Sequence, residues 1–147
     1  MDTVLRTFRG QPLCIENNAF NFLGFNPSMV LPIKSLDEAY EDFYCSLHGK
    51  ESLEKEKLLD DLNESYNILK ISKRRAQHLL VLYDLWPPQY SEGEDFMDFL
   101  FDIQEGKISQ TLESYEEKFD KALENNQKDR LQEIYWIMAG FWNLEES

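Results

Sequence analysis

Histidine and cysteine are the side chains that most often bind metals or act as nucleophiles near neutral pH. This sequence has two of each: His48, His78, Cys14 and Cys45. Only Cys45 and His48 lie close together, at the i,i+3 spacing of a helix, and nothing nearby completes the four ligands of a zinc site. We therefore expect no metal and no cofactor. The two cysteines are more typical of small buried apolar residues than of a disulfide.

Other catalytic patterns are sparse. Gly49-Lys50 and Gly106-Lys107 are isolated dipeptides rather than a phosphate-binding loop. No nucleophile elbow is present, although sequence alone leaves a Ser-His-Asp triad open. Pairs of carboxylates arise by chance among 28 acidic residues, and solvated helix faces explain them. We expect that this protein is not an enzyme.

The charge of the chain excludes several classes of partner. Its 147 residues include 28 Asp and Glu but only 15 Lys and Arg, which gives a formal net charge of −13. Nucleic acids and anionic membranes bind clustered basic residues, so neither is expected as a partner. Hydrophobic residues make up 42% and aromatic residues 14%, enough to build a folded core.

Cellular location follows from the same composition. No apolar run approaches the roughly 20 residues that span a bilayer, and residues 1–10 lack the apolar segment of a secretory signal. Two free cysteines suit a reducing compartment. Asp2 and Glu16 do not fit a mitochondrial presequence, so we expect a bacterial cytoplasm rather than a mitochondrial matrix.

Helical periodicity dominates the first half. Residues 1–19 show no regular pattern and are predicted to form an irregular arm that packs loosely or is partly disordered. The cluster at 20–25 fits one helical turn that ends at Gly24, and Pro32 and Ser35 mark the start of the next helix. Two apolar stripes follow, with a break at 71–72 where Ser72 is a candidate N-cap for a helix over 73–85. The stripe residues are Leu36, Tyr40, Phe43 and Leu47, then Leu58, Leu59, Leu62, Tyr66 and Leu69.

Three further helices are expected after Pro87 and Pro88, which end the preceding one. They run over about 94–107, 109–125 and 128–143, with short connections that make neighbours antiparallel. The predicted fold is all-α: a small helical hairpin domain at 20–86, a linker at 87–93 and an antiparallel three-helix bundle at 94–147.

Several segments together resemble a known family. Residues 22–47, followed by His48-Gly49-Lys50, are similar to helices I and II of a J-domain. The segment 62–69 resembles its third helix, and 75–82 resembles the Arg-Ala-x-Tyr-Leu-Leu-x-Leu segment of HscB-type co-chaperones of iron–sulfur cluster assembly. The segment 96–105 is similar to the opening of that family's C-terminal bundle. The resemblance covers about residues 20–144 in the same order.

The resemblance implies a function and partners. A J-domain of this family pairs helices II and III in an antiparallel hairpin and stimulates a DnaK-class chaperone ATPase, HscA in bacteria. The C-terminal bundle binds an IscU-type scaffold protein and delivers it to that chaperone. By resemblance, the scaffold-binding residues on the bundle are Met97, Phe101, Asp102, Glu105 and Trp136. The alternative is that Met97, Phe101 and Trp136 pack between the domains or against the N-terminal arm.

The chain departs from the family at the chaperone contact. His48, Gly49 and Lys50 stand where J-domains have His-Pro-Asp, so the charge of the third residue is reversed. The helix that is normally basic carries four acids, Asp37, Glu38, Glu41 and Asp42, with only Lys34 opposing them. A like-charge contact costs free energy, so stimulation of a DnaK-class ATPase should be impaired or altered. The alternative is a chaperone that carries compensating charges. His48 is also a favourable residue at a helix C-terminus on ordinary grounds.

Two hypotheses follow from these residues. The first is a divergent HscB-like scaffold-binding protein with altered chaperone coupling. The second is an acidic all-α interaction adaptor that retains a J-like fold without a chaperone role.

Overall fold

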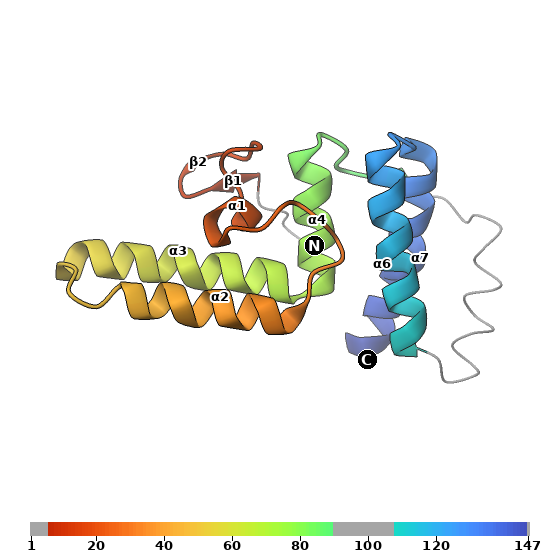
Figure 1. Ribbon diagram of the computed structural model, residues 1–147. Helices are drawn as coiled ribbons and strands as arrows, with labels where there is room; N and C mark the ends of the chain where they lie inside the picture. The colour runs from red at the N-terminus through yellow and green to blue at the C-terminus, as the bar shows by residue number, and fades with distance from the viewer. Residues whose placement is uncertain (1–5, 90–107, 147) are drawn as a thin grey trace. The chain divides into compact units, whose positions relative to one another are not determined.

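The computed structural model describes residues 6–89 and 108–146. These residues are mostly helical, with six helices and one two-stranded hairpin, which confirms the all-α class (Figure 1). The chain divides into two compact units, Met1–Asp84 and Leu85–Ser147. The division falls shortly before the predicted linker at 87–93, whose last four residues lie outside the described ranges.

The first unit begins with a small hairpin and a short helix. Strand β1 (Thr7–Phe8) pairs antiparallel with β2 (Gln11–Pro12). Arg9 and Gly10 between them have φ angles of 56° and 76°, as a two-residue turn with right-handed strand twist requires. Residues 1–19, predicted as an irregular arm, therefore contain an ordered hairpin. Its strands are too short to show an alternating pattern in the sequence.

Helix α1 (Ala19–Leu23) ends at Gly24 as predicted, and it begins after a cap that the sequence analysis did not identify. The Asn18 side chain accepts a hydrogen bond from the backbone N–H of Asn21, which caps the first turn. Gly24 ends the helix in the left-handed conformation with φ 83°.

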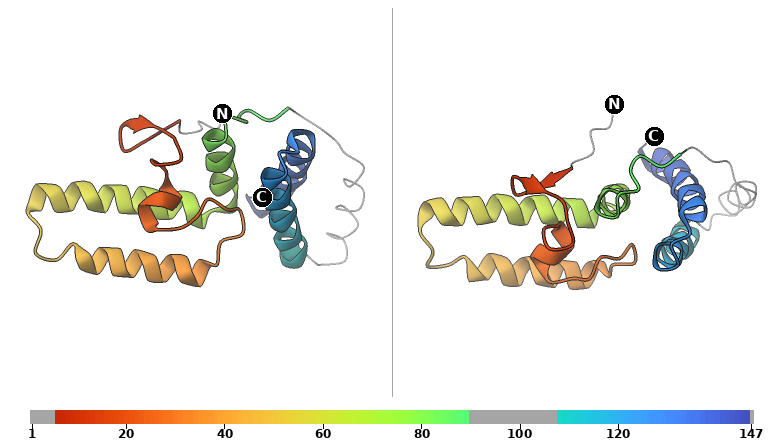
Figure 2. Two further views of the ribbon diagram at one scale, coloured as in Figure 1. Left: turned by 45° about the horizontal axis from the view of Figure 1, so that its top comes forward. Right: turned by 90° about the horizontal axis from the view of Figure 1, so that it is seen from above.

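Helices α2 (Ile33–Ser46) and α3 (Ser52–Lys70) form an antiparallel hairpin and lie side by side (Figures 1 and 2). Two side-chain bonds fix their register: Tyr40 pairs with Asn63, and Asp37 pairs with Tyr66. The partner on α2 moves back by three residues when the position on α3 moves forward by three, as antiparallel helices require.

Helix α4 (Ser72–Leu82) turns away from the end of α3 (Figure 1). The extended backbone of Ile71, with φ −91° and ψ 116°, separates the two helices and serves as the N-cap of α4. The prediction of Ser72 as N-cap is therefore wrong by one residue, because Ser72 is already helical. The helix also ends earlier than predicted, since Asp84 has φ 59°.

The core of the first unit is drawn from all of its helices and from the hairpin. Helix α1 packs against both α2 and α3, and α3 also packs against α4. Phe8 of β1 is only 1% exposed, so the N-terminal segment contributes to this core. Cys14 and Cys45 are free and exposed, so the expectation that they are buried apolar residues is wrong. The buried apolar residues are Phe8, Ala19, Phe20, Met29, Leu31, Leu36, Leu47, Leu62, Ile68, Leu69, Ala76, Leu79 and Leu80.

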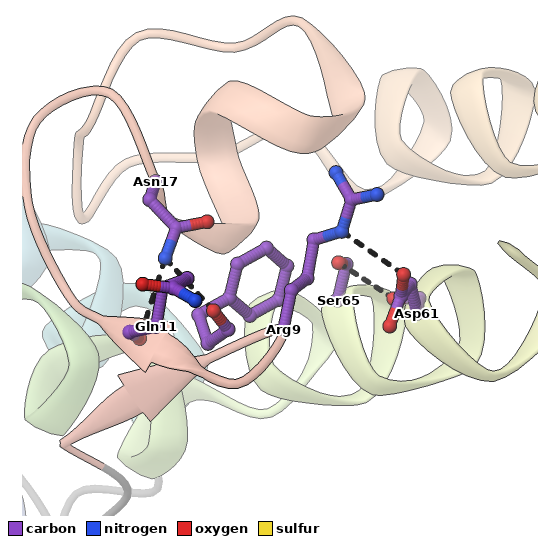
Figure 3. A network of polar contacts seen from close by, with 6 residues as sticks. Arg9, Gln11, Asn17, Asp61 and Ser65 are labelled. Atoms are coloured by element: carbon purple, nitrogen blue, oxygen red, sulfur yellow. Dashed lines mark hydrogen bonds and ion pairs between the residues drawn. The ribbon is translucent and has the colours of Figure 1, made fainter. Parts of the chain in front are cut away.

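Polar contacts hold the N-terminal hairpin on α3, as Figure 3 shows. The Arg9 side chain donates from Nε to Oδ2 of Asp61 at 2.9 Å, and its guanidinium lies 5.1 Å from the centre of the Phe22 ring. The Asn17 amide donates to the backbone carbonyl of Phe8 at 2.8 Å, which ties the segment after β2 back to β1. Asp61 is mostly buried, and its ion pair with Arg9 offsets the free-energy cost of burying a carboxylate.

The second unit contains helices α6 (Ile108–Glu124) and α7 (Lys128–Glu146), which pack against each other. The predicted turn at Asn125-Asn126 is present, and Asn126 has φ 56°. The first of the three predicted bundle helices, at 94–107, falls outside the described residues. The buried apolar residues of this unit are Tyr115, Phe119, Ala122, Leu131, Ile134, Tyr135, Ile137, Met138, Phe141 and Trp142.

Candidate functional site

His48, Gly49 and Lys50 form the turn between α2 and α3, and all three are exposed. The His48 backbone N–H donates to the carbonyl of Cys45 at 3.3 Å, so the residue continues the end of α2. Its ring lies edge-on to Tyr44, with 6.3 Å between ring centres. The Lys50 ammonium pairs with Glu54 at 3.7 Å, an exposed ion pair of little energetic weight.

Gly49 gives this turn a backbone that proline cannot adopt. Its φ angle is 89°, whereas the ring of proline fixes φ near −65°. This turn therefore differs from a His-Pro-Asp loop in its backbone conformation as well as in its side chains.

The exposed face of α2 is acidic. Asp37, Glu38, Glu41 and Asp42 are all exposed, and the hydroxyl of Tyr66 donates to Oδ1 of Asp37 at 2.6 Å. Carboxylates repel an acidic partner and attract a basic one. The four acids that the sequence places on this helix thus lie on an accessible surface.

Tyr66 differs from its sequence interpretation. The stripe on α3 placed Tyr66 in the core beside Leu69. Leu69 is fully buried, whereas Tyr66 is half-buried and its hydroxyl bond to Asp37 is exposed. A tyrosine at the edge of an apolar stripe can keep its hydroxyl in water. Its polar hydroxyl was therefore the one feature in the sequence that could have placed Tyr66 at the surface.

Buried polar residues on α4 anchor the first unit. Arg75 is 4% exposed, and its side chain donates from Nε to the carbonyl of Met29 at 2.9 Å and from Nη1 to that of Leu69 at 2.6 Å. The segment between α1 and α2 is thereby tied to the end of α3. The sequence marked Arg75 only as part of a family motif.

His78 is a second buried anchor that sequence reasoning did not single out. Its Nε2 accepts a hydrogen bond from the Ala19 backbone N–H at 3.0 Å, and its ring packs near those of Phe8 and Phe20. Burial, reinforced by the charge of Arg74, lowers the pKa of His78 to about 4. The imidazole is therefore neutral at pH 7, with its proton on Nδ1.

Trp136 lies on α7 and is half-buried. Its indole Nε1 donates to the backbone carbonyl of Gln89 at 2.8 Å, and its ring lies edge-on to Tyr135 at 5.3 Å. The Trp86 ring also lies edge-on to that of Tyr135, with 5.8 Å between ring centres. Part of the Trp136 side chain thus holds the segment that leads into this unit, while part remains accessible. The other predicted scaffold-binding residues lie outside the described residues: Met97, Phe101, Asp102 and Glu105.

Neither metal-ligand clusters nor membrane spans are found within residues 6–89 and 108–146. No three His, Cys, Asp or Glu side chains gather there as ligands, and none of these helices is long and apolar enough to cross a bilayer. Comparison with known proteins finds no matching family model, no matching curated protein and no matching solved structure.

Proposed function

We propose that this protein is a divergent HscB-like co-chaperone of iron–sulfur cluster assembly. It binds an IscU-type scaffold through its C-terminal half and has an altered contact with a DnaK- or HscA-class chaperone. The observation that carries the proposal is the antiparallel α2–α3 hairpin, joined across His48-Gly49-Lys50 and followed by α4 with Arg75 at its buried side. This order of elements is the one that the resemblance implies.

The altered chaperone contact is supported by the turn and by the helix before it. Lys50 stands where the family has a carboxylate, and Gly49 adopts a φ angle that proline cannot adopt. The acids of α2 are exposed to solvent. A chaperone with the family's ordinary docking surface would repel the acids of α2 through its own acidic residues, and would repel Lys50 through the arginine that normally pairs with the aspartate of His-Pro-Asp. The co-chaperone role therefore rests on scaffold binding, with chaperone docking weakened or rewired.

Scaffold binding is supported by Trp136, whose ring remains partly accessible on α7. Large aromatic side chains are the residues most enriched at the centres of protein interfaces. The bond from its indole to Gln89 fixes the ring in one orientation, so little side-chain entropy is lost on binding. The free, exposed cysteines suit a reducing compartment such as a bacterial cytoplasm.

Affinity purification from the source organism tests the proposal. The full chain carrying a tag should enrich an IscU-type scaffold, and Trp136→Ala should lose most of that enrichment. Tyr83→Ala is the matched control, because Tyr83 is an exposed aromatic residue at the end of α4. Enrichment of other proteins without any scaffold would instead favour the acidic adaptor, for which the exposed carboxylates of α2 are the supporting feature.

A further inference from the structure

Three tyrosines form an aromatic row along the seam between α2 and α3. Tyr44 and Tyr40 lie one turn apart with ring centres separated by 6.3 Å and nearly parallel rings, at 14°. Tyr66 of α3 continues the row at 4.7 Å from Tyr40. We call Tyr40, Tyr44 and Tyr66 the tyrosine row. Tyr44 is 45% exposed, and Tyr40 and Tyr66 are half-buried, so the row offers part of its aromatic surface to solvent.

Hydrogen bonds hold two of these rings in place. The Tyr40 hydroxyl donates to Oδ1 of Asn63 at 2.8 Å, and the Tyr66 hydroxyl donates to Oδ1 of Asp37 at 2.6 Å. Rings that are already ordered lose little freedom when a partner binds. Rigid tyrosines with an apolar face and a polar tip are typical of recognition surfaces.

The surroundings of the row favour a cation. The Lys70 ammonium already lies 5.1 Å from the centre of the Tyr66 ring. Asp37 and Glu41, both exposed, lie three residues before Tyr40 and Tyr44, so each α2 tyrosine has a carboxylate one helical turn away. An arginine guanidinium satisfies both features, because it stacks on aromatic faces and donates in a fork to carboxylates.

We propose that the tyrosine row docks an arginine-bearing segment of a partner protein. Phosphate-rich partners are disfavoured, because their charges would meet the carboxylates of α2. The inference does not depend on the proposed function, since it uses only residues of the first unit and holds for any partner that carries such an arginine segment.

An arginine peptide tests the proposal on the full chain. The probe is a peptide of about twelve residues that repeats Ala-Arg-Ala-Gln, long enough to cover the row. Lysine and glutamate versions of the same peptide serve as comparisons. In about 0.1 M salt, where distant charges are largely screened, backbone amide NMR shifts should change mainly along the facing positions of α2 and α3. The arginine peptide should bind more tightly than the lysine peptide, and the glutamate peptide should not bind.

Variants separate the row from the general acidity of the chain. Tyr44→Leu, which keeps apolar surface but removes the ring, should weaken binding of the arginine peptide about tenfold, a loss expected for one desolvated cation–π contact. Glu41→Gln keeps the fold and should also weaken it. Tyr83→Leu, at a tyrosine that is 41% exposed, should change affinity less than about twofold, as expected for a residue outside the contact.

Three results would overturn the proposal. The first is a set of shifts scattered over acidic residues of both units, with equal affinity for the arginine and lysine peptides. The second is unchanged affinity in Tyr44→Leu. The third is self-association of the protein that Tyr44→Leu abolishes, which would assign the row to a second copy of this chain.

Discussion

His78 of α4 accepts a hydrogen bond from the backbone N–H of Ala19, although 59 residues separate the two in the sequence. The first N–H groups of a helix have no partner inside the helix. Asn18 satisfies the N–H of Asn21, and His78 satisfies that of Ala19, so the start of α1 is capped from two directions. The bond requires a neutral imidazole, because protonated Nε2 can no longer accept.

Stability of the first unit should therefore decrease at acidic pH. The folded pKa of His78, about 4, lies below its unfolded value of 6.5, so between these values only the unfolded chain takes up the proton. The loss begins as pH falls through 6.5 and is complete below the folded pKa, where it reaches about 3 kcal/mol. Urea unfolding at a series of pH values measures it. Far-ultraviolet circular dichroism is the suitable signal, because Trp86, Trp136 and Trp142 all lie in the second unit.

His78→Gln is the matched variant for this prediction, and His48→Gln is its control on the exposed turn. The pH slope between about 6.5 and 4 should flatten in the first and persist in the second. Burial raises the pKa of Glu64, which strengthens the fold as pH falls, so the difference between variants is the quantity to compare. Equal slopes in the wild type and His78→Gln would contradict the assignment.

Arg75 should be the most sensitive charged position of the first unit. Arg75→Met leaves the carbonyls of Met29 and Leu69 without these donors in a buried site, which should cost roughly 2–4 kcal/mol of unfolding free energy. Arg75→Lys should recover only part of the loss, because an ammonium lacks the fork of the guanidinium. Thermal unfolding followed by circular dichroism measures both.

Arg74→Met provides the comparison for Arg75, since Arg74 is the half-buried neighbour on the same helix. Its cost should stay below about 1 kcal/mol, as for most substitutions away from buried networks. A cost as large as that of Arg75→Met would remove the special role given to the two carbonyl bonds.

Chaperone stimulation should be absent or weak. In a single-turnover ATPase assay with the cognate DnaK-class chaperone, the wild-type protein should leave the rate close to its basal value. Lys50→Asp alone should not restore stimulation, because Gly49 keeps a φ of 89° and the acids of α2 remain. Clear stimulation at micromolar wild-type protein would show that the chaperone carries compensating charges.

Helical periodicity was sufficient to locate most of the described elements. The stripe through Leu36 and Leu47 predicts α2, and that through Leu62 and Leu69 predicts α3, because both helices bury one face. Gly24 and Asn126 marked real ends, since each adopts a positive φ. Local rules succeed where a residue's backbone preference and its burial agree.

Contacts between distant segments were beyond such rules. The bond from Ala19 to His78 and the pair of Arg9 with Asp61 join residues more than fifty positions apart. The sequence spacing of these residues gives no indication that either pair is in contact. The tyrosine row was missed for a related reason, because Tyr40 and Tyr66 fit apolar stripes and only the packed hairpin shows that they meet at its surface.

Scaffold binding is the central claim, and calorimetric titration of the full chain with an IscU-type scaffold from the same organism tests it most directly. Saturable one-to-one binding is expected, and Trp136→Ala should weaken it about tenfold, as expected for an aromatic residue at an interface centre. Trp136→Phe, which keeps a ring but loses the bond to Gln89, should lie between the two, and Tyr83→Ala should bind like the wild type. Absence of binding heat with about 100 μM protein at two temperatures, between which the heat of burying apolar surface must change, would contradict scaffold binding.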